Sequence, residues 1–189
     1  VQCTPGYVPN SLMQETRQEL HSKDLVCLIE GLWTVQTGDA MQEYSDRLSS
    51  RMNLSGVAVS GDGRCLIPLI RDANEQGRKV YLGGYSLGDD NAEDIARACG
   101  EQGLDIDILF LLDGTDAKKI SSNVGRVVYL RGIADNYLFR GDMYTREHLE
   151  NPETELRVIY LDASHLGVPS LAYPYLEEEI RNDQEGNKR

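Results

Sequence analysis

The 189-residue sequence lacks several features that would place a protein in a functional class at once. No apolar run approaches the roughly 18 residues that cross a bilayer, which argues against a membrane span. Basic residues are too few to balance the acidic ones, 19 against 31, so the formal net charge is −12. This balance argues against binding to nucleic acid and against docking on anionic membranes, because both need a basic surface.

Cysteines are also scarce, and histidines scarcer still. The four cysteines, Cys3, Cys27, Cys65 and Cys99, have no C-x-x-C spacing and no nearby histidine, so we expect no metal site. Which of them form disulfides stays open. No basic-then-apolar leader is present, and both a cytoplasmic and an exported protein are compatible with the sequence. The start at Val1 favours export after removal of a leader.

The stretch Lys79–Asp90 is the most informative part of the sequence, because residues 84–88 spell Gly-x-Ser-x-Gly. Apolar residues before the motif predict a strand, and helix-like apolar spacing from Asn91 onward predicts a helix. In a tight turn between strand and helix, the serine of this motif is exposed as a nucleophile. The sequence therefore predicts a nucleophilic Ser86, with the backbone amide of Leu87 available to bind an oxyanion. The alternative interpretation is a glycine-rich connection with an incidental serine.

Predicted strands and helices alternate along the chain. Strands are expected at 24–33, 57–59, 80–82, 106–112, 126–130 and 156–161, and helices at 37–51, 66–75, from 91 to 100 or 103, and as a short acidic segment beyond 175. Continuous apolar strands are typical of sheets buried on both faces. The alternation predicts an α/β fold: a three-layer, doubly wound, mostly parallel sheet with helices on both faces. We expect one domain at 24–180, preceded by an N-terminal arm and short helix at 1–23 and followed by a polar tail at 181–189.

Polar residues with catalytic potential follow several of the predicted strands. Ser86, Asp113, Asp135 and His165 each come just past a different strand. Because the carboxyl ends of parallel strands meet at one edge of the sheet, where ligands bind, we expect these side chains to share a site. Their order along the chain, serine, then acid, then histidine, is the order that α/β-hydrolases use.

The motifs resemble those of compact α/β-hydrolases of the lipase, esterase and thioesterase kind, in particular small bacterial members. The resemblance extends over residues 24–170 and is carried by GYSLG at 84–88, LFLLDGTD at 109–116 and VIYLDASHLGVP at 158–169. It implies a reduced form of the α/β-hydrolase fold, with Ser86 as the nucleophile and His165 as the general base.

The same resemblance leaves the acid at either of two positions. Asp113 occupies the position used by pancreatic-lipase-like members and is favoured by its LLDG context, whereas Asp135 has the more common placement. A second oxyanion amide would come from the loop after the first strand, at Leu32 or, with a shift of one residue, at Trp33. One departure from the family pattern is Asp89–Asp90 directly behind the motif, which would repel an anionic substrate if it pointed into the site.

These residues predict a serine hydrolase that cleaves a carboxylic ester or thioester through an acyl-enzyme on Ser86. The expected partner is a small-molecule acyl substrate, and the chemistry requires no metal or organic cofactor. The alternative is a non-catalytic binding or envelope-associated domain that retains the hydrolase fold. A nucleotide-binding protein is disfavoured because the turn lacks G-x-G-x-x-G and a P-loop lysine.

Overall fold

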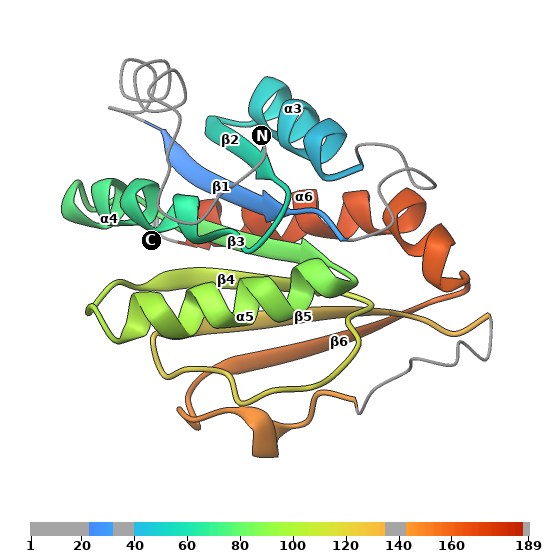
Figure 1. Ribbon diagram of the computed structural model, residues 1–189. Coiled ribbons are helices and arrows are strands. Elements are labelled where there is room, and N and C mark those ends of the chain that lie inside the picture. The colour runs from blue at the N-terminus through green and yellow to red at the C-terminus, as the bar shows by residue number, and fades with distance from the viewer. Residues whose placement is uncertain (1–22, 32–39, 135–142, 187–189) are drawn as a thin grey trace.

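One parallel β-sheet forms the centre of the molecule in the computed structural model, which describes residues 23–31, 40–134 and 143–186. Its strands are β1 (Asp24–Ile29), β2 (Leu54–Val59), β3 (Val80–Tyr85), β4 (Ile106–Leu112), β5 (Val124–Gly132) and β6 (Glu155–Leu161). The six strands have the order β2-β1-β3-β4-β5-β6, and every neighbouring pair is parallel (Figure 1).

Among the described residues, four α-helices cover the two faces of this sheet. They are α3 (Ala40–Arg51), α4 (Ile67–Glu75), α5 (Leu87–Gly100) and α6 (Val168–Gly186). Helices α4 and α5 pack on one face, and α3 and α6 pack on the other (Figure 1). Short 3₁₀ turns occupy η2 (Arg64–Leu66), η3 (Arg146–His148) and η4 (His165–Gly167). The predicted three-layer α/β architecture is therefore confirmed. None of the described helices is both long and apolar enough to cross a membrane.

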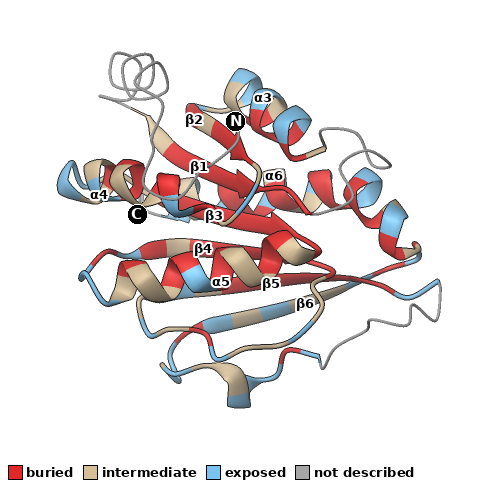
Figure 2. Cartoon of the chain, viewed as in Figure 1, coloured by how far each residue is buried: buried red, intermediate tan, exposed pale blue. Residues whose placement is uncertain are grey.

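The strands of the sheet interior are buried on both faces, as their continuous apolar runs predict. In β1, Leu25, Cys27 and Ile29 face the helix pair α4 and α5, while Val26 and Leu28 face α3 and α6. Strand β6 lies at the edge of the sheet and is largely exposed or half-buried along its length (Figure 2). The core thus consists of two apolar layers separated by the sheet.

Two helices differ from the sequence prediction. Helix α5 begins at Leu87, not near Asn91, because the two acidic residues behind the motif are favourable in the first turn of a helix. Helix α6 begins at Val168 and includes Pro174, although an interior proline costs a helix about 3 kcal/mol. Burial of the apolar side of α6, including Leu176, on the sheet offsets that cost.

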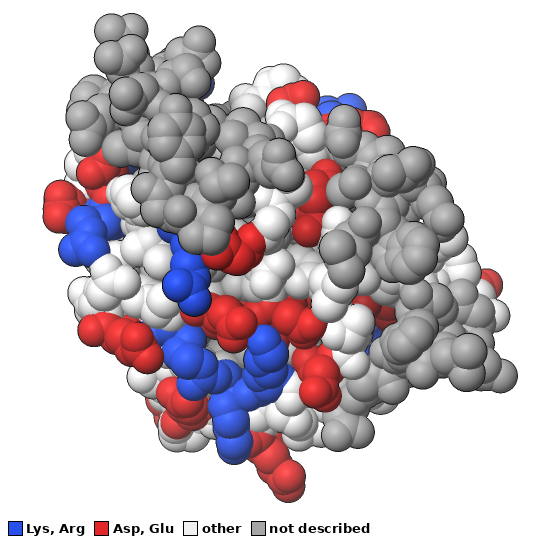
Figure 3. All heavy atoms as spheres, in the orientation of Figure 1, with Lys and Arg blue, Asp and Glu red and all other residues white. Residues whose placement is uncertain are grey.

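Charged side chains of both signs are mixed on the exposed face of α5 (Figure 3). Ion pairs there join Arg97 to Glu150 at 3.4 Å and Lys118 to Asp94 at 3.1 Å. Such exposed pairs contribute about 0–1 kcal/mol each, so they affect solubility more than folding.

The path of the chain creates a switch point in the sheet. From β1 the chain moves outward to β2 and then returns to β3 on the other side of β1. Connections therefore leave the carboxyl ends of β1 and β3 in opposite directions, and such points are where ligands bind in α/β sheets. Gly31 follows β1 and Ser86 follows β3 at this point.

Candidate active site

Ser86 lies in the sharp turn between β3 and α5. Its backbone has φ 56° and ψ −121°, a strained conformation for a residue with a side chain, which costs on the order of 1–3 kcal/mol. The amide of Ser86 donates to the Leu112 carbonyl at 3.0 Å, and its own carbonyl accepts from the Asp89 amide at 3.0 Å. These two hydrogen bonds hold the turn between β4 and the first turn of α5.

The glycines of the motif are needed because backbone segments meet closely around this turn. A Cβ on Gly84 would lie 2.1 Å from the Gly88 carbonyl oxygen, and a Cβ on Gly88 would lie 2.3 Å from the carbonyl oxygen of Ile29. Neither position can accept a side chain without moving the helix away from the sheet. The two glycines of the motif are therefore needed for the close packing of α5 on the sheet as well as for the turn.

His165 reaches Ser86 from the turn η4, directly after β6. Its Nε2 lies 3.1 Å from Ser86 Oγ. The hydroxyl of Tyr85 donates to the carbonyl oxygen of His165 at 3.0 Å, and the two rings stack with centroids 5.2 Å apart at an interplanar angle of 24°. Tyr85 thus contacts both the backbone and the ring of His165.

Asp113 completes the arrangement from the end of β4. Its Oδ2 lies 2.7 Å from His165 Nδ1, and its Oδ1 accepts from the Gly132 amide at 3.2 Å. The Asp113 backbone has φ 55°, a left-handed conformation that aspartate tolerates better than most residues. Its amide donates to the Leu130 carbonyl at 2.8 Å, which anchors the turn to β5.

These contacts define the protonation pattern of the imidazole. A carboxylate can only accept, so Nδ1 of His165 carries the proton that it donates to Asp113. Nε2 is then free of hydrogen and can accept the hydroxyl proton of Ser86. All three side chains are at most 5% exposed, so the hydrogen bonds lie away from competing water. The arrangement can transfer a proton from the serine hydroxyl to the imidazole.

Of the expected oxyanion amides, that of Leu87 lies within the described residues. Leu87 is the first residue of α5, where the amide has no carbonyl one turn earlier to bond to. Leu32 and Trp33 lie outside the described residues, but the preceding Gly31 is close to Ser86: a Cβ there would lie 2.7 Å from the Tyr85 carbonyl oxygen and 3.1 Å from Ser86 Cβ. The alternative acid, Asp135, also lies outside the described residues.

The two acidic residues behind the motif turn toward the segment that follows β4. Asp89 Oδ1 accepts from the Leu112 amide at 2.8 Å, and Asp90 Oδ2 accepts from the Thr115 hydroxyl at 2.8 Å. Both carboxyl groups therefore bind groups next to Asp113. The sequence gives no signal for these contacts, because the paired residues are more than 20 positions apart.

The contacts described above involve none of the cysteines. Cys27 and Cys99 are free and buried, and burial raises the pKa of both thiols, that of Cys99 to about 11. Cys65 is disulfide-bonded. Within the described parts of the chain, no group of three or more histidine, cysteine, aspartate or glutamate residues is arranged to hold a metal ion.

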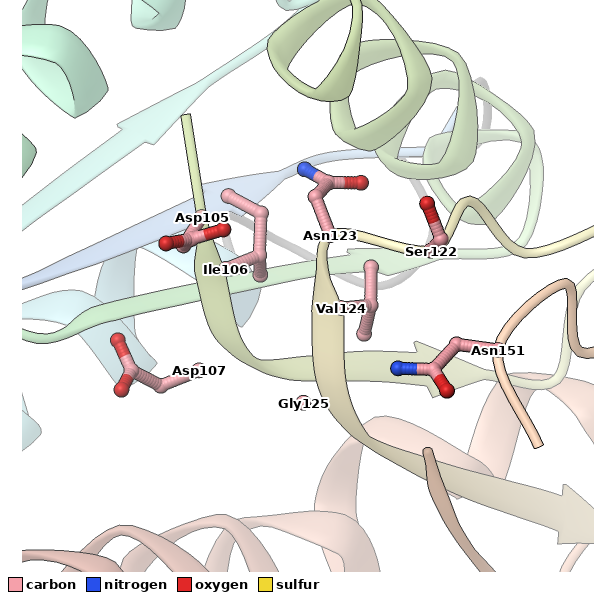
Figure 4. A pocket seen from close by; sticks show the side chains of 8 residues that line it. All are labelled: Asp105, Ile106, Asp107, Ser122, Asn123, Val124, Gly125 and Asn151. Atoms are coloured by element: carbon pink, nitrogen blue, oxygen red, sulfur yellow. The ribbon is translucent and has the colours of Figure 1, made fainter. Parts of the chain in front are cut away.

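A hollow of about 250 Å³ lies at the opposite edge of the sheet, at the amino ends of β4 and β5 (Figure 4). Polar side chains line much of it, including Asp105, Asn123 and Asn151. Because Ser86 and His165 lie at the carboxyl edge, this hollow is separate from the site described above.

Comparisons with known proteins agree with this architecture. No family model and no curated protein sequence matches the chain. Among solved structures, it is similar to a candidate α/β hydrolase of unknown function from Agrobacterium tumefaciens, with a TM-score of 0.60 and 9% identity over 87% of each chain. Dienelactone hydrolase from Anabaena variabilis has a TM-score of 0.55 and 14% identity over 82% of this chain and 84% of its own. Human thioesterase 2 has a TM-score of 0.55 and 10% identity over 84% of this chain and 94% of its own. The chain therefore has the α/β-hydrolase fold.

Proposed function

We propose that the protein is a serine hydrolase that cleaves a carboxylic ester or a thioester through an acyl-enzyme on Ser86. His165 acts as the general base, and Asp113 orients it. The observation that carries the proposal is the continuous series of contacts from Ser86 Oγ to His165 Nε2 at 3.1 Å and from His165 Nδ1 to Asp113 Oδ2 at 2.7 Å. A serine in a strained backbone conformation with positive φ at the end of a central strand supports it further.

The reaction proceeds in two stages on this geometry. His165 accepts the proton of Ser86 as Oγ attacks the substrate carbonyl, and the developing oxyanion is bound by the backbone amides of Leu87 and Leu32. Each such donor contributes about 3–4 kcal/mol of transition-state stabilisation in serine hydrolases. The imidazolium then protonates the leaving alcohol or thiol, which departs and leaves the acyl group on Ser86. Water, deprotonated by His165, hydrolyses this acyl-enzyme and restores the serine.

The surroundings of the site favour a small, neutral, apolar acyl group. Ile133 follows β5 at the same edge of the sheet and is 53% exposed, and Leu166 directly follows His165 and is 47% exposed. The similarity to a thioesterase and to an ester-type hydrolase agrees with both leaving groups. With a net charge of −12, the protein is proposed to act on a small molecule and not on nucleic acid or an anionic membrane surface.

Labelling with a fluorophosphonate probe tests the proposal directly, because the probe reacts with an activated serine and not with an ordinary hydroxyl. We expect the folded wild-type protein to be labelled and to hydrolyse p-nitrophenyl acetate and an N-acetylcysteamine thioester. Ser86→Ala should abolish labelling and turnover while circular dichroism and melting temperature stay close to wild type. Absence of labelling and of turnover in the folded wild type would overturn the proposal in favour of a non-catalytic domain with this fold.

A further inference from the structure

Asp89, three residues after Ser86, is a fully buried carboxyl group that the proposed reaction does not use. Its Oδ1 accepts from the Leu112 amide at 2.8 Å, and Leu112 directly precedes the proposed acid, Asp113. On the other side of that acid, Gly114 packs against the same carboxyl: a Cβ there would lie 2.5 Å from Asp89 Oδ2. Asp89 therefore contacts the residues on both sides of Asp113.

A second contact from the same helix turn holds the next part of the segment. Asp90 Oδ2 accepts from the Thr115 hydroxyl at 2.8 Å, and the Asp90 carbonyl accepts from Lys118 Nζ at 3.2 Å. The helix that begins at the proposed nucleophile thus also fixes the turn that carries the proposed acid. Helix α5 thereby connects Ser86 and Asp113 by a route that does not pass through the imidazole.

The surroundings of Asp89 favour its neutral form. Its Oδ2 has no hydrogen-bond partner among the described residues, and burial raises its pKa well above the usual range. The titratable groups that face it are Asp90 and Glu93 on α5, Asp113 at the end of β4 and Tyr129 on β5. The three carboxyl groups in this set disfavour a further negative charge at Asp89.

We propose that Asp89 is a positioning residue: its contacts with Leu112 and Gly114 fix the turn that carries Asp113 and thereby set the contact between Asp113 and His165. A neutral carboxyl accepts the Leu112 hydrogen bond without adding a second anion beside Asp113. This inference rests on the proposed function, because it concerns the alignment of the general base.

Two substitutions at Asp89 separate the hydrogen bond from the charge. Asp89→Asn keeps an acceptor of the same shape, whereas Asp89→Ala removes it. The matched control is Asp94→Ala, because that side chain lies on the same helix and is 62% exposed. Each variant is measured for ester hydrolysis, with kcat and KM determined separately, and for the NMR resonance of the His165 Nδ1 proton, which reports its hydrogen bond to Asp113. The NMR measurement needs no turnover, so it tests the positioning role independently of the proposed function.

We expect Asp89→Ala to lower kcat about 10- to 100-fold with KM changed less than about 3-fold, because a small misplacement of a catalytic group reduces the rate and not the binding. The NMR resonance of the His165 Nδ1 proton should move upfield in the same variant, because its hydrogen bond to the Asp113 carboxylate weakens. Asp89→Asn should restore most of the kcat and the wild-type resonance. Asp94→Ala should match wild type in both measurements.

Two results would overturn the inference. Equal losses in Asp89→Asn and Asp89→Ala would show that the charge of Asp89 matters and not its acceptor. A wild-type Nδ1 proton resonance in Asp89→Ala would show that Asp89 does not position the acid. If Asp89→Ala fails to fold, Gly114→Ala disturbs the same contact from the side of the turn, and it should shift the His165 Nδ1 proton resonance in the same direction. An inactive wild type with the expected resonance shifts would refute the proposed function alone.

Discussion

Replacing Asp113 by asparagine tests which nitrogen of His165 carries the proton. The buried Gly132 amide donates to Asp113 Oδ1, and this donor still needs an acceptor in the variant. The asparagine oxygen therefore stays on Gly132, and its NH₂ group turns toward His165 Nδ1. Because that group donates, Nδ1 must accept, and the single imidazole proton moves to Nε2. Nε2 can then no longer accept the proton of Ser86.

The wrong tautomer is costly in a serine hydrolase. We expect kcat to fall about 10⁴-fold in Asp113→Asn, the loss typical of this substitution in a serine–histidine–aspartate arrangement. The loss corresponds to about 5 kcal/mol of activation free energy. Folding should be almost unchanged, because asparagine has the same shape and tolerates the φ of 55° at this position. A large kinetic effect without a comparable loss of stability distinguishes a catalytic role from a structural one.

The assay is ester hydrolysis under saturating substrate, together with thermal unfolding of each variant. Asp116→Asn is the matched control, because Asp116 lies in the same segment with an exposed side chain. It should keep wild-type turnover. The reasoning would be refuted if Asp113→Asn retained more than about a tenth of the wild-type kcat, since a tautomer change cannot leave so much activity. A large loss in Asp135→Asn with a near-wild-type Asp113→Asn would assign the acid to Asp135 instead.

Two further predictions concern a buried carboxyl and a glycine. Burial raises the pKa of Glu93 to about 8, so the folded state binds a proton that the unfolded chain releases near pH 4.5, and stability should fall as pH rises between these values. Glu93→Gln should reduce this pH dependence of the unfolding free energy by up to about 1.4 kcal/mol per pH unit, measured in denaturant titrations from pH 5 to 8. An unchanged pH dependence would contradict the raised pKa of Glu93. Gly31→Ala should lower kcat about 100-fold, because the new Cβ would press on the Tyr85 carbonyl and on Ser86. The control is Gly186→Ala, which should keep the wild-type kcat because no heavy atom lies within 4 Å of the new Cβ. Equal turnover in the two glycine variants would show that the approach of the Gly31 backbone is not needed.

The sheet could be predicted from the sequence because its strands are continuous apolar runs. Strand β4, expected at 106–112, has those bounds in the structure. Helix α6 could not be predicted in full, since Pro174 indicates a break and the packing that overrides it is tertiary. The sequence predicts the start of α5 too late for a related reason: the glycine and acidic residues behind Ser86 favour a turn when they are considered without the sheet.

The serine and the histidine of the site could be predicted from the sequence, but the choice of acid and the supporting contacts could not. Chain order and strand ends indicated Ser86 and His165, but two aspartates followed adjacent strands, and sequence spacing could not choose between them. The structure brings Asp113 within 2.7 Å of the imidazole. The contacts of Tyr85 with His165 and of Asp89 with Leu112 join residues 80 and 23 positions apart, so no local pattern could reveal them.

Gly132, which has no side chain, explains how His165 can reach Ser86. His165 follows β6, which is three strands away from β3, a separation of roughly 14 Å at the usual strand spacing. The chain must therefore turn back over the end of β5 directly after β6. Gly132 ends β5 at that point, and a Cβ on it would lie 2.7 Å from the Ala163 carbonyl oxygen and 2.9 Å from Val168 Cγ2. Since its amide also donates to Asp113, Gly132 both lets the histidine segment pass and holds the acid that the histidine meets.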